Sequence, residues 1–129
     1  MRRPSTYSPG APADQLPLTP AVFHILLALA DQDRHGYAII LDVADRTGGE
    51  LRLGTGTLYT AISRLLEGGL IEEPDERPSE DEDDERRRYY RLTSFGRDVA
   101  NAEARRLAGL VRMARSRGIT GALAGARAK

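Results

Sequence analysis

Between Gly54 and Ile71 the chain carries hydroxyl, phenol and guanidinium groups at spacings that could place them on one side of a helix. These polar side chains are Thr57, Tyr59, Thr60, Ser63 and Arg64. Apolar residues recur between them at the three-and-four spacing of a buried stripe, namely Leu58, Ala61, Ile62 and Leu65. Hydroxyls and a helix N-terminus hold phosphate, and an arginine pairs with guanine or phosphate oxygens. The segment therefore predicts a helix whose polar face suits a nucleic-acid groove, with an ordinary solvated amphipathic helix as the alternative.

The ends of this helix follow from its flanking residues. Thr55 is expected to cap a helix that begins near Gly56, and the pair Gly68-Gly69 is expected to stop it. The stretch Gly54-Thr55-Gly56-Thr57 lacks the Gly-Lys-Ser/Thr ending of a nucleotide-binding loop, which favours contact of Thr55 with a DNA phosphate instead.

The elements around the helix of residues 56–67 must position its polar face. Two helices are predicted upstream, one from Pro20 to about Asp31 after a Thr19 cap, and one from Tyr37 until residues 47–49 interrupt it. Alternation at Leu51 and Leu53 predicts a short strand, and residues 70–73 and 87–93 predict the two strands of a hairpin. This order predicts a mainly α (α+β) fold, a winged helix-turn-helix domain over residues 18–93.

A long helix is predicted after the hairpin, from about Ser94 to Arg117, with Thr93 as its cap and Gly118 as its stop. Apolar residues along it follow the spacing of a helix-pairing seam, namely Ala100, Ala104, Leu107, Leu110, Val111 and Ala114. Residues 94–118 are therefore expected to form a dimerisation helix, although the stripe could instead pack on its own domain. A symmetric dimer would place two recognition helices about 34 Å apart, which predicts an inverted-repeat operator.

Short motifs in this order resemble the PadR-like transcriptional regulators. The matching pieces lie across residues 18–117 and are Leu26 to Leu29, His35-Gly36-Tyr37-Ala38-Ile39, Gly56-Thr57-Leu58-Tyr59, Arg64-Leu65, Gly69-Leu70-Ile71, and Arg88 to Thr93 followed by Gly96. The resemblance implies a dimeric DNA-binding regulator, in which Tyr59 contacts DNA and the C-terminal helix pairs. It also implies an effector that is a small aromatic or drug-like compound. The chain departs from the family at Thr55 and Thr60, where members often carry proline.

The hairpin loop is unusual for a wing that approaches DNA. Residues 72–85 hold ten carboxylates and one basic residue, Arg77, and Arg86, Arg87 and Arg88 follow. Phosphate repels such a loop, so we expect its tip to be disordered and to point away from DNA, while Arg88 and Arg91 hold backbone phosphate. A solvated linker without a regulatory role is one alternative. Another is a winged-helix protein-interaction module whose acidic loop captures a basic partner.

Charge and composition limit the other classes of function. The chain has 19 basic and 19 acidic residues, but outside residues 72–88 there are 15 basic and nine acidic ones, which is compatible with nucleic acid as a partner. Cysteine is absent, and His24 and His35 are the only histidines. The sequence therefore predicts no metal site, no cofactor and no enzyme activity. Residues 1–17 are expected to form a disordered arm and residues 119–129 a flexible tail, and we expect a cytoplasmic protein with no membrane association.

Overall fold

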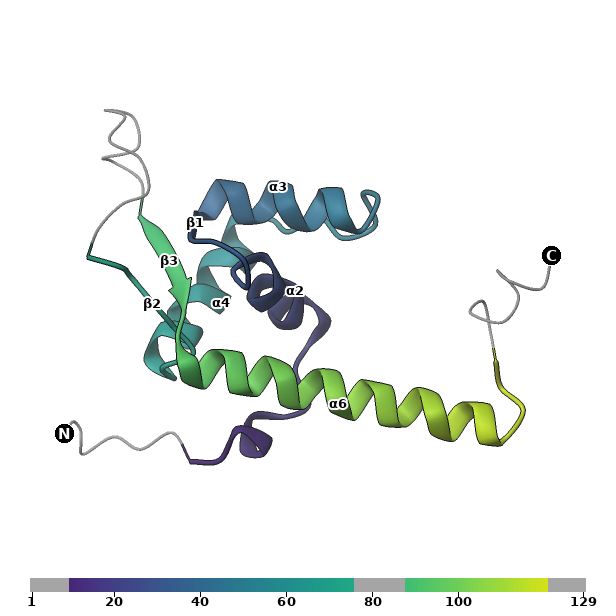
Figure 1. The fold of residues 1–129 in the computed structure, drawn as a ribbon. Helices are drawn as coiled ribbons and strands as arrows, with labels where there is room; N and C mark the ends of the chain where they lie inside the picture. The colour runs from purple at the N-terminus through teal and green to yellow at the C-terminus, as the bar shows by residue number, and fades with distance from the viewer. Residues whose placement is uncertain (1–9, 76–87, 121–129) are drawn as a thin grey trace.

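The computed structural model describes residues 10–75 and 88–120 of the 129-residue chain. The elements in chain order are η1 (Pro12–Gln15), α2 (Pro20–Ala28), β1 (Arg34–His35), α3 (Gly36–Arg46), α4 (Thr55–Glu67), β2 (Ile71–Glu72), β3 (Tyr89–Leu92) and α6 (Ser94–Ser116). In Figure 1, α2, α3 and α4 pack together beside the small sheet, and α6 runs past them and extends beyond the domain. This arrangement agrees with the predicted α+β winged helix-turn-helix fold.

Side-chain caps set the start of each of the first two long helices. The Val22 amide donates to Thr19 Oγ1 over 3.2 Å at the start of α2, as predicted. The Ala38 amide donates to His35 Nδ1 over 3.1 Å, so His35 is the cap of α3. The sequence predicted the start of this helix at Tyr37 and no cap at His35, because histidine is a less common cap than serine or aspartate.

The first long helix is shorter than predicted. It ends at Ala28 rather than near Asp31. Arg34 Nε donates to the Ala28 carbonyl oxygen over 2.6 Å, and Arg97 donates to the Ala30 carbonyl oxygen over 2.8 Å. These arginines satisfy carbonyls at the helix end, where helical bonding has stopped.

Two predictions about the approach to α4 were wrong. The cap residue of α4 is Gly54, and Thr55 is the first helical residue with no side-chain capping bond. Leu51 and Leu53 lie in a connecting loop rather than a strand: their side chains reach the core, and no strand in the described part of the chain pairs with them. The strand in this half of the domain is instead β1, whose two residues are too short to produce a visible alternation.

The three strands form an antiparallel sheet in the order β1-β3-β2. Arg34 pairs with Tyr90 on one side of β3, and Ile71 pairs with Leu92 on the other. The predicted hairpin is thus present as β2 and β3, and β1 ties it to the start of α3. The predicted disorder of the acidic tip falls on residues 76–87, which lie outside the described residues.

The core lies where α2, α3, α4 and the sheet meet, and its fully buried side chains include Ile25, Leu26, Ile39, Val43 and Leu58. The first turns of α6 close it with Val99. Gly96 allows this approach, since a Cβ there would collide with the Leu70 carbonyl oxygen. The predicted Thr93 cap of α6 is confirmed, because the Gly96 amide donates to Thr93 Oγ1 over 2.9 Å.

The segment before α2 differs from the disordered arm that its composition predicts. Within residues 10–17, η1 packs along α6, and Leu16 contacts the core. Residues 1–9, like the tail residues 121–129, lie outside the described part of the chain. No helix within residues 10–75 and 88–120 has both the length and the apolar character to cross a membrane.

Candidate nucleic-acid interface

The two faces of α4 separate as the spacing predicts. Leu58, Ile62 and Leu65 are buried, whereas the polar residues named above are exposed, namely Thr57, Tyr59, Thr60, Ser63 and Arg64. Thr55 is exposed at the first position of the helix. The structure therefore presents every predicted recognition residue of α4 to solvent.

The N-terminus of α4 is open to an anion. No side chain caps it, and its first turn contains no acidic residue. The first amides of a helix have no partner within the helix, and the helix dipole makes this end positive. Gly54 and Gly56 leave open space around the backbone, because a Cβ at either position would meet no atom within 4 Å. A phosphate group could approach these amides closely.

Tyr59 is held against the start of α3. Its ring lies where the side chain of residue 36 would stand, since an ideal Cβ on Gly36 would be 2.7 Å from Tyr59 Cζ and closer still to the hydroxyl. Tyr59 nevertheless remains 45% exposed. Burial raises the pKa of the Tyr90 phenol, and the nearby Tyr59 phenol adds to that increase. The contact with Gly36 therefore positions a half-exposed phenol beside the sheet, a relation that spacing within α4 did not reveal.

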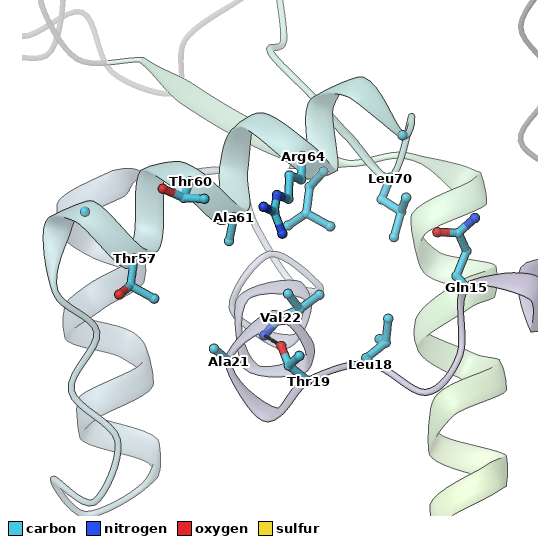
Figure 2. Close-up of a pocket in the computed structure, with 13 residues that line it drawn as sticks. Gln15, Leu18, Thr19, Ala21, Val22, Thr57, Thr60, Ala61, Arg64 and Leu70 are labelled. Carbon is cyan, nitrogen blue, oxygen red and sulfur yellow. Dashed lines mark hydrogen bonds between the residues drawn. The ribbon is translucent and has the colours of Figure 1, made fainter.

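Arg64 lies beside a groove between α2 and α4. Figure 2 shows Arg64 and Ala61 on α4 opposite Val22 on α2, with Leu18 and Gln15 toward one end. Thr57 and Thr60 also line this groove. The polar face of α4 thus divides into a part beside α2, with Arg64, and a part beside α3, with Tyr59.

The two predicted wing arginines are paired with carboxylates. Arg88 lies 2.8 Å from Glu73 across the hairpin, and Arg91 lies 3.1 Å from Asp33 before β1. The Asp33 carboxylate raises the pKa of Arg91 above its usual value. Both arginines are surface-exposed, so these ion pairs are weak and a phosphate could replace the carboxylate. Contact of either arginine with DNA would require that exchange.

The predicted seam on α6 is divided between two environments. Ala100 packs against the core, and Ala114 is half-buried. Ala104 is exposed, and so are the large apolar residues in the part of the helix that leaves the domain, namely Leu107, Leu110, Val111 and Met113. The first turns of the helix therefore pack on their own domain, while the distal turns leave an apolar stripe uncovered.

Glu103 interrupts the seam, and the spacing of apolar residues had not indicated it. Its side chain is only 2% exposed. Arg106 donates to both of its oxygens over 2.7 and 2.8 Å, and the Leu18 amide donates over 3.3 Å. The bonds from Arg106 hold the pKa of Glu103 below its usual value. In the sequence, the i,i+3 spacing of Glu103 and Arg106 was the pattern that could have indicated this ion pair.

Nowhere in the described part of the chain do three or more His, Cys, Asp or Glu side chains gather as a metal ion would require.

Comparison with known sequences connects this geometry to a family. Residues 25–102 match the profile described as the transcriptional regulator PadR-like family. An uncharacterized protein X of Lysinibacillus sphaericus is 33% identical over 73 residues, and these cover 57% of this chain and 64% of the relative. An uncharacterized 37.1 kDa protein in transposon Tn4556 of Streptomyces fradiae is 40% identical over 86 residues, 67% of this chain and 22% of the relative. The chain thus matches less than two thirds of the length of either relative.

Solved structures share the fold. A transcriptional regulator from Clostridium thermocellum superimposes with a TM-score of 0.61 and 24% identity, over 74% of this chain and 89% of that one. A PadR family regulator from Clostridium difficile gives 0.60 and 25% identity, over 74% and 94% of the two chains. PadR of Bacillus subtilis, solved in complex with operator DNA, superimposes with a TM-score of 0.54 and 19% identity, over 67% of this chain and 47% of that one.

These structures confirm the α+β winged-helix fold, and the profile match spans more than half of the chain, including α4 and the hairpin strands. The family consists of transcriptional regulators rather than enzymes. The chain therefore belongs to the PadR-like family of transcriptional regulators.

Proposed function

We propose that this protein is a sequence-specific DNA-binding repressor that places α4 in the major groove. The observation that carries the proposal is the exposed face of α4, with four aliphatic hydroxyls, a phenol and a guanidinium and no carboxylate before Glu67. Hydroxyls and arginine are the groups that contact phosphates and base edges, and an uncapped helix N-terminus adds positive potential. In this proposal Thr55 and Thr57 contact phosphate, while Tyr59, Thr60, Ser63 and Arg64 face the bases.

The uncovered stripe of α6 supports a homodimer. Leu107, Leu110 and Val111 form a continuous apolar surface beyond the domain, and such surfaces commonly mark protein interfaces. A two-fold dimer would bind an inverted repeat whose half-sites are about one helical turn, roughly 34 Å, apart. Repression by blocking a promoter, relief by a small aromatic or drug-like effector, and action in the cytoplasm on chromosomal DNA complete the proposal.

The test is fluorescence anisotropy with duplex DNA from immediately upstream of the protein's own gene, compared with a scrambled duplex at two salt concentrations. We expect tighter binding to the upstream duplex, and weaker binding at higher salt because phosphate contacts release counterions. Equal, weak binding to both duplexes would contradict the proposal if selection from a random-sequence pool also yields no duplex that binds more tightly.

Arg64→Ala is the variant that links this binding to α4. It should weaken specific binding by about 1–3 kcal/mol if Arg64 makes a good base contact. Arg105→Ala is the matched control, since Arg105 is exposed on α6, away from the recognition helix. An equal loss in both variants would point to general electrostatic attraction and not to a recognition role for Arg64.

A further inference from the structure

The distal half of α6 carries a row of arginines that the fold leaves unpaired. Arg105, Arg112 and Arg115 are exposed, and none of them makes a hydrogen bond or an ion pair with another residue of the ranges 10–75 and 88–120. The arginines nearer the domain differ, since Arg97 donates to a backbone carbonyl and Arg106 to a buried carboxylate. The three distal residues, called the arginine row below, are therefore a cationic surface open to an anionic partner.

The arginine row is separate from the apolar seam on the same helix. An α-helix turns by about 100° per residue, so Arg105 and Arg112 stand about 140° and 160° around the helix from Leu110. Pairing of α6 through Leu107, Leu110 and Val111 would leave both arginines facing solvent. A partner on the row and a partner on the seam can thus bind at the same time.

The chain itself supplies a segment of complementary charge. Residues 104–129 hold seven basic side chains and no carboxylate, whereas residues 72–85 hold ten carboxylates and one basic side chain. Six of these carboxylates are consecutive, at residues 80–85, which are called the acidic run below. Six extended residues span about 20 Å, and positions 105 and 115 of a helix lie about 15 Å apart. The acidic run is therefore long enough to lie along the whole arginine row.

The acidic run cannot reach the arginine row of its own chain. Figure 1 shows the hairpin end of β3 and the distal turns of α6 on opposite sides of the molecule. Arg115 lies about 32 Å along α6 from Ser94. Residues 76–87 are joined to the hairpin at both ends, so the midpoint of this segment extends at most about 20 Å from β2 and β3. A contact between the run and the whole row must therefore join two copies of the chain.

We propose that the acidic run of one copy docks on the arginine row of a second copy. Carboxylates and guanidiniums form paired, charge-assisted hydrogen bonds. Each exposed pair contributes little by itself and is screened by salt, so the contact depends on several pairs acting together. Nucleic acid has the same sign of charge, but every copy of the chain brings one acidic run for each arginine row.

The contact relates to the proposed homodimer without depending on DNA. A dimer through the apolar seam would hold the run of one copy close to the other copy and would raise its effective concentration at the row. Only this increase rests on the proposed function. The pairing of the run with the row follows from charge and length alone.

The first experiment detects the run of one copy at the helix of another. The chain contains no cysteine, so Ser79→Cys allows a single nitroxide spin label to be attached beside the acidic run. Spin-labelled full-length protein is mixed with isotope-labelled protein that has no spin label, and the amide NMR spectrum is recorded. We expect loss of signal at Arg105, Arg112 and Arg115, and its recovery at about 0.5 M salt, where the Debye length is about 4 Å. Undiminished signals in the mixture, or loss only when both labels are in one chain, would overturn the proposal.

Charge variants test whether the contact is electrostatic. Changing the six carboxylates of residues 80–85 to the corresponding amides preserves the length of the run and the spin label, and it should restore the signals. The triple variant Arg105→Gln, Arg112→Gln and Arg115→Gln should restore them from the other side. Arg52→Gln, at an exposed arginine between α3 and α4, is the matched control and should leave the loss unchanged. Loss of signal that persists in either charge variant would reflect dimer geometry alone and would overturn the proposal.

Sedimentation velocity on the same proteins separates this contact from the apolar seam. We expect the triple arginine variant to remain a dimer, because the apolar residues of the seam are unchanged. A monomeric triple variant would show that the row belongs to the seam, which would overturn the proposal. A monomeric wild type that still shows the salt-sensitive loss of signal would instead refute the seam and support the docking of the run.

A scrambled duplex tests the other anionic partner. Added to the isotope-labelled protein alone, it should leave the signals of the arginine row in place, because the proposed DNA contacts lie on α4. Shifts at the row with the duplex, together with no effect of the spin-labelled run, would assign the row to nucleic acid and overturn the proposal.

Discussion

At the scale of single residues, the contact between Gly36 and Tyr59 explains why the start of α3 matters to α4. The Tyr59 hydroxyl occupies the place of a Cβ at residue 36, so the absence of a side chain there sets the direction of the phenol. The ring remains half-exposed, and it lies near Tyr90 of the sheet. Glycine at position 36 thus shapes the proposed DNA-binding surface although it is itself buried.

Gly36→Ala should move Tyr59 without unfolding the domain, because the atoms that a new Cβ meets belong to the free end of an exposed side chain. If Tyr59 contacts DNA, specific binding should weaken by about 1–3 kcal/mol. In a Tyr59→Ala background the same substitution should cost nothing further, since the displaced ring is gone. Anisotropy on the four proteins measures this cycle, and additive losses would show that Gly36 acts independently of Tyr59.

At the scale of elements, Glu103 joins α6 to the segment that leads into α2. Its buried carboxylate accepts from Arg106 on its own helix and from the Leu18 amide, which lies 85 positions away in the sequence. A buried charge is tolerated only when its hydrogen bonds are satisfied, and here three donors meet two oxygens. This contact helps to hold residues 10–19 along α6, so the N-terminal segment is part of the domain.

Glu103 also predicts how stability depends on pH. Its folded pKa lies below the ordinary 4.5, so its stabilising effect is complete above that value and is lost as the pH falls through the folded pKa. Glu103→Gln should cost about 1.5–3 kcal/mol at neutral pH, as loss of a charged hydrogen-bond network implies, and should flatten the acid limb of the stability curve. Denaturant unfolding at fixed protein concentration measures both effects. The exposed Glu50→Gln is the control, and an equally steep acid limb in Glu103→Gln would contradict the assignment.

At the scale of the whole molecule, α6 extends past the domain with its distal apolar residues uncovered (Figure 1). An isolated helix of this kind gains stability from packing rather than from its own backbone. We therefore expect the uncovered stripe to pair two copies of α6. This pairing would set the distance between the two α4 helices that contact the two halves of the operator.

Charge on that stripe should abolish the dimer. The double substitution Leu110→Arg and Val111→Arg buries two unpaired charges at the proposed seam and should give a monomer in sedimentation velocity. DNA binding should weaken strongly as the second half-site is lost, while the circular dichroism of the domain persists. Arg115→Glu, at an exposed position of the same helix, should remain dimeric. A dimeric double variant would place the interface elsewhere.

The acidic hairpin loop should also influence DNA binding by the whole molecule. Replacing residues 74–85 by a short Gly-Ser linker removes a dense negative charge from the hairpin and should leave DNA affinity unchanged or higher, because the loop repels phosphate. Anisotropy at low and moderate salt measures the change. Loss of DNA binding by a folded variant would mean that the loop contributes to recognition. If the wild type captures a basic protein and the variant does not, the interaction-module alternative is favoured.

Much of the fold follows from local patterns in the sequence. The buried stripe of α4, the Thr19 and Thr93 caps and the Gly68-Gly69 stop were all predictable, because each depends on residues within a few positions of one another. One prediction failed locally, since the cap of α4 is Gly54 and not Thr55. The failed strand prediction concerned distant partners. The strand β1 exists because Arg34 and His35 pair with Tyr90 and Tyr89, more than fifty positions later, and Leu53 enters the core from a loop.

In the candidate site, too, some features follow from local sequence and others depend on residues far apart in the chain. The sequence by itself determined which side chains α4 presents, since a helical period of 3.6 residues separates the polar face from the apolar one. Only the tertiary structure decided which neighbours those side chains meet: Gly36 beneath Tyr59, the α2 groove beside Arg64, and Asp33 against Arg91. These contacts join residues far apart in the chain, and the packing of one element on another selects them, which local spacing cannot encode.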